Sequence, residues 1–167
     1  LGGKIFLAGQ KKVLDKPVKA CYNDYRKARE ERTMTYYWDM DGVLADFHKN
    51  YNGNRDLACS REYLANLDPF TANVATLNAL IASGETCYIL TKAASEDARD
   101  GKIDWLAKYV PAIDENHFIC IVGYGRKIDY IREDGILIDD DGRNTKEWIK
   151  GGQIAITLTA KGEKVIL

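Results

Sequence analysis

Short apolar runs alternate with helical patterns from Thr33 onward, and this alternation constrains the fold more than any other feature. Most of the runs are continuously apolar, as expected for strands that are covered on both faces of a sheet. Strands that alternate with helices are typical of a parallel sheet in an α/β domain. The sequence therefore predicts a parallel sheet flanked by helices. The predicted strands are Thr35–Asp39, Thr86–Leu90, Phe118–Val122, Ile136–Asp139 and Ile154–Leu158.

Capping residues mark the helices between these strands. Apolar residues at helical spacing predict a helix over Thr71–Ser83. Ser95 is the predicted N-cap of a helix that ends before Pro111. Asn144, with Glu147 three residues later, resembles a capping box for a further helix.

Two segments fall outside the alternating pattern. Residues 1–32 hold nine Lys/Arg against four Asp/Glu, which predicts a basic, helical N-terminal arm. A single domain is expected over 33–167, with a small insertion at about 48–70 after the first strand. The basic arm leaves contact with nucleic acid as an alternative, but a solvated helix face is the favoured interpretation.

Composition excludes several classes of protein. No apolar run approaches the roughly 18 residues that span a bilayer, so no membrane partner is expected. Cys87 and Cys120 lie in apolar runs and are expected to be free thiols. With only His48 and His117 as histidines, a zinc site is a poor hypothesis. A reducing, cytoplasmic setting is expected, and the sequence leaves the oligomeric state open.

The strongest local signal is the segment Trp38-Asp39-Met40-Asp41-Gly42, directly after an apolar run. Two carboxylates separated by one residue at a strand end can project to the same side. Such a pair can share a cation while one oxygen of Asp39 remains available to attack. The alternative is an ordinary turn, because Asp and Gly are common turn residues.

A second acidic cluster favours a metal site over an ordinary turn. Asp139, Asp140 and Asp141 follow the apolar run at 136–138. Parallel strands place their carboxyl ends at one edge of a sheet, so this cluster and the first should meet there. We therefore expect Asp39, Asp41, Asp139 and Asp140 to form a metal site, although Asp141 or Asn144 could instead cap the following helix. Ligands that are all oxygen favour Mg²⁺.

Thr91 and Lys127 are the predicted phosphate-binding residues. Thr91 ends the apolar run at 86–90, and Lys127 follows the run at 118–122 and a glycine-containing loop. A lone threonine at a strand end is usually structural, and a lone lysine is usually a solvated surface group. Lys92 and Arg126 compete with Lys127 for contact with the phosphoryl group.

These four positions together resemble the motifs of the haloacid dehalogenase (HAD) superfamily of phosphatases. Asp39-Met40-Asp41-Gly42-Val43 is similar to its first motif, and Thr91 to its second. Lys127 is similar to its third motif, and Ile138-Asp139-Asp140 to its fourth. Within the superfamily, the stretch from Asp39 to Phe47 most resembles the 5′(3′)-deoxyribonucleotidases. The resemblance implies a Rossmann-like core, with residues 48–70 as a small cap.

The resemblance also implies a mechanism and a substrate. Asp39 would attack phosphorus to form an aspartyl-phosphate, and Asp41 would act as acid and base. Mg²⁺ would be held by Asp39, the backbone carbonyl of Asp41 and Asp139, with help from Asp140. Lys127 and Thr91 would bind the phosphoryl oxygens. The substrate would be a small phosphorylated molecule, a nucleoside monophosphate, with Phe47 against its base and Lys92 as a further binding residue.

Two alternatives remain at the level of sequence. A small cap could leave the site open to a macromolecular phosphorylated substrate, which the basic arm would favour. A receiver-like module that accepts a phosphoryl group without turnover also combines acidic residues, Thr, Lys and Mg²⁺. In a receiver the acidic pair comes first along the chain, whereas here Asp39 and Asp41 precede Asp139 and Asp140. The order favours the hydrolase.

Overall fold

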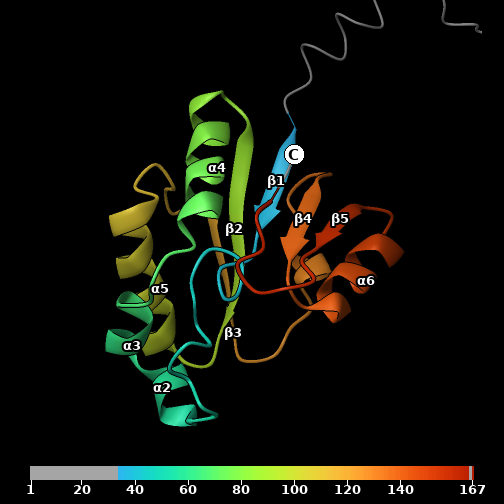
Figure 1. Ribbon diagram of the computed structural model, residues 1–167. Coiled ribbons are helices and arrows are strands. Elements are labelled where there is room, and N and C mark those ends of the chain that lie inside the picture. Colours follow the sequence, from blue (N-terminus) through green and yellow to red (C-terminus); the bar gives the residue numbers. More distant parts are fainter. Residues whose placement is uncertain (1–33, 166) are drawn as a thin grey trace, which may run out of the picture. The chain divides into compact units, whose positions relative to one another are not determined.

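The computed structural model describes residues 34–165 and 167, and the predicted arm at 1–32 lies outside these residues. The described part is an α/β domain with one parallel sheet in the order β3-β2-β1-β4-β5 (Figure 1). The predicted parallel sheet flanked by helices is confirmed. Its strands are β1 (Thr35–Trp38), β2 (Thr86–Ala93), β3 (Phe118–Val122), β4 (Ile136–Asp139) and β5 (Ile154–Thr157).

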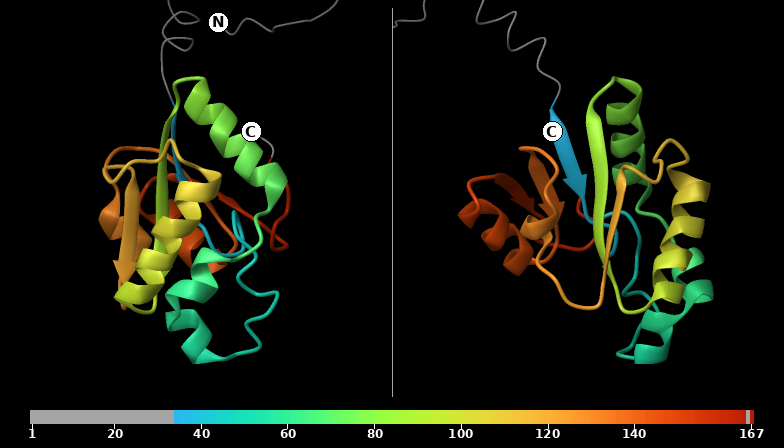
Figure 2. Two further views of the ribbon diagram at one scale, coloured as in Figure 1. Left: turned by 90° about the vertical axis from the view of Figure 1, so that its left-hand side faces the viewer. Right: turned by 180° about the vertical axis from the view of Figure 1, so that it is seen from behind.

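Helices cover both faces of the sheet. Along the chain, β1 to β3 step toward one edge of the sheet, and β4 and β5 step toward the other. Right-handed crossovers then place α4 (Thr71–Ala82) and α5 (Glu96–Tyr109) on one face and α6 (Gly142–Lys150) on the opposite face. Figure 2 shows the sheet between these helices. A short 3₁₀ helix, η1 (Lys127–Tyr130), contacts α6.

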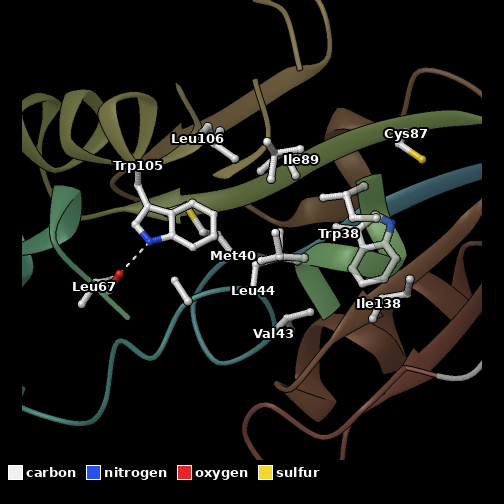
Figure 3. Close-up of a cluster of buried hydrophobic side chains, with 14 of the residues drawn as sticks. Trp38, Met40, Val43, Leu44, Leu67, Cys87, Ile89, Trp105, Leu106 and Ile138 are labelled. Carbon is white, nitrogen blue, oxygen red and sulfur yellow. Dashed lines mark hydrogen bonds between the residues drawn. The ribbon is translucent and has the colours of Figure 1, made fainter. Parts of the chain in front are cut away.

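Alternate residues of the central strands build two separate cores. Trp38, Ile89 and Ile138 are neighbours across β1, β2 and β4 and belong to the core that includes residues of α4 and α5. Figure 3 shows this core around Trp38, and Trp105 of α5 within it. Tyr37 belongs to the second core, with Trp148 of α6. Both faces of the sheet are therefore buried, which explains the unbroken apolar runs.

β2 is longer than the sequence predicts. The expected end was Leu90, whereas the strand continues through Ala93. Thr91, Lys92 and Ala93 pair with Cys120, Ile121 and Val122 of β3, so β2 keeps a partner after β1 has ended. Thr91 and Lys92 thus lie in the carboxyl-terminal half of a strand rather than in a loop after it.

The helix caps agree with the prediction at one helix and differ at another. Ser95 caps α5 by accepting a hydrogen bond from the amide of Ala98, as predicted. The predicted capping box of Asn144 is wrong, because the N-cap of α6 is Asp141, whose side chain accepts from the amide of Arg143. Asn144 lies inside the helix and donates to Asp139 instead.

The segment from 48 to 70 contains two short helices that lie against α5. They are α2 (Arg55–Cys59) and α3 (Arg61–Ala65). Arg61 forms a two-pronged ion pair with Asp104 of α5, and the indole of Trp105 donates to the carbonyl of Leu67 (Figure 3). This segment is therefore attached to the same helix that packs on the sheet.

Three cysteines of the described part are free thiols, with Cys87 buried and Cys120 partly buried. Among the helices of the described residues, none combines the length and the apolar character needed to cross a membrane.

Candidate active site

A tight loop follows β1 and presents the first acidic pair. The carbonyl of Met40 accepts hydrogen bonds from the amides of Leu44 and Ala45, which folds the chain back immediately after Asp39. Gly42 has φ +82°, a conformation that residues with a side chain rarely adopt. A Cβ atom on Gly42 would also overlap the carboxylate of Asp140. The glycine is thus required both by the turn and by the close approach of the second acidic cluster.

Lys127 joins the ends of β1 and β4. Its ammonium lies 2.8 Å from Oδ1 of Asp39 and 2.7 Å from Oδ2 of Asp139, and its side chain is only 1% exposed. Burial acts to lower the pKa of Lys127, but the charges of the two carboxylates outweigh it and raise the pKa. Lys127 is therefore a charged group fixed between two carboxylates.

Asp139 is fully buried and held by three donors. Its Oδ2 accepts from Lys127 and from Nδ2 of Asn144 at 3.0 Å, and its Oδ1 accepts from the amide of Asp141 at 2.8 Å. Burial and the nearby charge of Asp39 raise the pKa of Asp139 to about 6, although Lys127 opposes this rise. Asp139 therefore has a fixed orientation and an unusually high affinity for a proton.

Three carboxylates come close enough to share a metal ion. Oxygen atoms of Asp39, Asp139 and Asp140 lie within 4.8 Å of one another. Burial, then Asp39, also raises the pKa of Asp140. When ionised, the three carboxylates exceed the single charge of Lys127 by two negative charges, so a divalent cation fits the charge of the site. Oxygen donors are the ligands that Mg²⁺ prefers.

The carboxylate of Asp41 does not belong to this group but pairs with a lysine of α5. Nζ of Lys102 lies 2.7 Å from Oδ1 of Asp41 and donates to Oγ1 of Thr91 at 3.1 Å. The contact with Asp41 is an ion pair without the angles of a hydrogen bond. Burial raises the pKa of Asp41, Lys102 opposes the rise, and Asp39 adds to it. The predicted contact of Asp41 with a metal therefore rests on its backbone carbonyl.

A pocket of about 460 Å³ opens above these groups. Its volume lies in the range of small-molecule sites. Most of the predicted site residues line it, including Phe47 and Lys92 as well as Asp39, Asp41, Thr91, Lys127 and Asp140. Arg126 instead pairs with Asp129 at the surface and is 62% exposed. The structure thus places Lys127 and Lys92 at the pocket, and Arg126 outside it.

Sequence reasoning missed Lys102, and it also missed His48 and Lys161, which line the pocket. Lys102 is four residues after Ala98 and three before Trp105, which places it on the buried face of α5. A lysine on an otherwise apolar helix face was the signal that could have identified it. Lys161 comes from the chain after β5, where no motif marked it.

The sequence of the chain matches one known protein family. Residues 55–161, more than half of the chain, match the model of the family described as 5′ nucleotidase, deoxy (pyrimidine), cytosolic type C. The matched range includes Thr91, Lys127, Asp139 and Asp140 and begins after Asp39 and Asp41. No curated protein matches the chain.

Proposed function

The chain belongs to the cytosolic type C 5′-nucleotidase family of the HAD superfamily, and we propose that this nucleotide phosphomonoesterase works through a phosphoryl group carried on Asp39. The observation that carries the proposal is the convergence of Asp39, Lys127 and Asp139 where β1 and β4 end. An attacking carboxylate beside a buried ammonium and further carboxylates fits phosphoryl transfer better than a structural role. The family match also favours a hydrolase over a receiver-like module.

In the first step, an oxygen of Asp39 attacks phosphorus. A bond forms between this oxygen and phosphorus while the bond from phosphorus to the ester oxygen breaks. In the second step, water attacks the phosphorus and releases Asp39 and inorganic phosphate. Covalent catalysis replaces one difficult displacement by two easier ones. Lys127 holds Oδ1 of Asp39 at 2.8 Å, which fixes the direction of the attacking group.

Asp41 serves as the acid and base of these steps. As an acid it protonates the leaving oxygen of the nucleoside, and as a base it takes a proton from the attacking water. It lines the pocket with its side chain 26% exposed, so a leaving group can reach it. Burial raises its pKa, which supports its role as a proton donor.

Mg²⁺ is the proposed cofactor, held by Asp39, Asp139 and Asp140 together with the backbone carbonyl of Asp41. When bound, it supplies positive charge that offsets the negative charge of the phosphoryl oxygens. The close approach of these three carboxylates supports this assignment. Lys127 and Thr91 bind the remaining phosphoryl oxygens, and Lys92 lies at the same pocket.

The proposed substrate is a nucleoside monophosphate, and a deoxypyrimidine nucleotide is the first candidate because the matching family is described by that substrate. Phe47 lines the pocket and packs against Tyr51 and Tyr63. A ring fixed in this way offers a surface on which a base can stack. We assign residues 48–70 as the cap at this side of the pocket, because this segment supplies Tyr51 and Tyr63, which pack against Phe47, and His48, which lines the pocket.

Phosphate release from deoxynucleoside, ribonucleoside and sugar monophosphates, with Mg²⁺ or EDTA, tests the proposal. Deoxynucleotides should be the best substrates, EDTA should abolish turnover, and Asp39→Asn should lower kcat about 10³-fold or more. Asp129→Asn removes a surface carboxylate outside the pocket and should leave kcat unchanged. Full turnover by the Asp39→Asn protein would overturn the nucleophile. Activity confined to oligonucleotide ends or phosphoproteins would overturn the small substrate.

A further inference from the structure

Lys102 is the buried charge that the mechanism above does not use. Its side chain is 1% exposed, and it reaches two residues of the site, Asp41 at 2.7 Å and Thr91 at 3.1 Å. Burial of an ammonium group is costly unless the group is paired. A lysine on the core face of a helix therefore indicates a specific task.

The packing of α5 sets the position of Lys102. Its neighbour Gly101 lies so close to α3 that a Cβ there would come within 2.5 Å of the carbonyl oxygen of Arg61. On the next turn, Trp105 is buried and hydrogen-bonded to Leu67. Contacts on both sides of Lys102 thus fix this part of α5. The position of the Lys102 side chain beside Asp41 and Thr91 is fixed with it.

Lys102 contacts groups that face the pocket without lining the pocket itself. Asp41 and Thr91 are among the residues that line it, whereas Lys102 is not one of the described residues that do. Lys127, in contrast, lines the pocket and pairs with the proposed nucleophile. The two buried lysines thus have different roles, and that of Lys102 must act through its two partners.

The chemistry of an ammonium group determines what Lys102 does to Thr91. A lysine has three donors and no acceptor, so Oγ1 of Thr91 must be the acceptor in their hydrogen bond. The hydroxyl hydrogen of Thr91 is then directed elsewhere, and the pocket is where an acceptor would enter. The same ammonium holds Oδ1 of Asp41, which leaves Oδ2 as the oxygen that exchanges a proton.

We propose that Lys102 is a positioning residue that holds Asp41 for proton transfer to the leaving group and directs the hydroxyl of Thr91 toward the phosphoryl group. This inference rests on the proposed function, because it needs Asp41 to act as the acid. Through its one ammonium group, Lys102 of α5 connects Asp41, which follows β1, with Thr91 of β2.

The test compares Lys102→Met with Lys108→Met. Both variants lose one lysine of α5, but Lys108 donates to Ala65 and Asn66 and lies outside the site. Single-turnover release of the leaving group is measured, with Mg²⁺ and with enzyme in excess, from a nucleoside monophosphate and from p-nitrophenyl phosphate. The p-nitrophenolate ion leaves without a proton, whereas the alkoxide of the nucleoside needs one. The folded state of each variant is checked by circular dichroism.

Lys102→Met should slow release of the nucleoside about 100-fold, at the lower end of what general acid catalysis contributes. Release of p-nitrophenol should slow far less, and Lys108→Met should match the parent on both esters. Adding Lys102→Met to Asp41→Asn should cause little further loss, because residues that act as a unit are not additive. If Lys102→Met does not fold, Lys102→Gln takes its place, with the same expected contrast between the two esters.

An equal loss on both esters, or full additivity with Asp41→Asn, would overturn the positioning role. So would parent-like rates in a folded Lys102 variant. These outcomes differ from failure of the proposed function, which would show in the parent protein as no release from either ester or in Asp39→Asn as full turnover.

Discussion

Asp139 is a carboxylate in which burial and a like charge oppose the ionised form. Three donors hold it in place, one of them the ammonium of Lys127, and still its pKa rises to about 6. The charged form is needed to bind a cation. The stability of the metal-free protein should therefore depend on pH through this residue.

The direction in which stability changes with pH follows from the protons that Asp139 binds in the folded and unfolded states. With a pKa of about 6 in the folded state and an ordinary pKa of 3.8 in the unfolded chain, Asp139 binds more protons when folded than when unfolded between these two pH values. The metal-free protein should therefore lose stability as pH rises from about 4 to above 6, on the order of 3 kcal/mol. Urea unfolding in EDTA at pH 5.0 and 7.5 should show roughly half of this loss, about 1.4 kcal/mol, because at pH 5.0 Asp139 is already partly ionised, to different extents in the unfolded and folded states.

Asp139→Asn is the control, since it removes the titrating group but keeps its shape. The loss between the two pH values should be smaller in this variant than in the parent. Adding Mg²⁺ should stabilise the parent more at pH 7.5 than at pH 5.0, because a metal ligand must lose its proton. Equal pH dependence in parent and variant would contradict this account.

At the scale of helices and strands, the sequence predicted most of the fold and the convergence of the site. Apolar runs located the five strands, and the topology of a parallel sheet brought Asp39, Thr91, Lys127 and Asp139 to one edge. The end of β2 was missed because pairing with β3 sustains the strand beyond its apolar run.

Two misses concern helices. The cap of α6 was left open between Asp141, which the structure confirms, and Asn144, because local spacing cannot show that the side chain of Asn144 turns inward to Asp139. Lys102 was missed because only its contacts with Asp41 and Thr91 connect it to the site. These two residues lie far from it in sequence or on other elements. Long-range pairing of this kind leaves no periodic signal in a single sequence.

The contact between α3 and α5 gives a prediction at this scale. Gly101→Ala would place a Cβ within 2.8 Å of Cβ of Leu64, as well as near the carbonyl of Arg61. Overpacking costs about 1–3 kcal/mol, and the better helix propensity of alanine returns ~1 kcal/mol of that. The contacts of 2.5 Å to a backbone oxygen and 2.8 Å to a Cβ place the cost in the upper part of this range, so we expect a net loss of about 1–2 kcal/mol in the free energy of unfolding, measured with urea.

Gly142→Ala is the matched control at the start of α6, where a Cβ meets no atom of the described residues within 4 Å. It should be neutral or stabilise the protein by up to ~1 kcal/mol. A Gly101→Ala protein as stable as the parent would show that α3 can move away from α5 without cost.

Across the whole described domain, Asn73 connects segments that are far apart in the chain. It is fully buried in α4, donates to the carbonyls of Val43 and Glu163, and accepts from the amide of Val165. The amide of Gly162 also donates to the carbonyl of Gly42. The chain after β5 is thereby attached to the loop that carries Asp41.

Asn73→Ala should destabilise the protein by about 3 kcal/mol, because three backbone groups, two of them in buried hydrogen bonds, lose their partner. Asn78→Ala on the same helix loses one side-chain bond, to the carbonyl of Tyr109, and should cost about 1 kcal/mol. Hydrogen exchange should also speed up at residues 158–165 in Asn73→Ala only. Similar losses of stability in both variants would show that the three hydrogen bonds of Asn73 do not stabilise the domain more than the single one of Asn78.

Among the strands of residues 34–165, β1 is the first to be synthesised, yet it lies in the middle of the sheet. A growing chain on the ribosome carries Asp39 before either neighbour of β1 has been made. β2 emerges next with Thr91, and β4 follows much later with Asp139, after Lys127. The proposed nucleophile is thus translated before its partners, so a nascent chain can assemble this site only after Asp139 has been made. A product truncated before Asp139 would carry Asp39 without this partner, and we expect it to be inert.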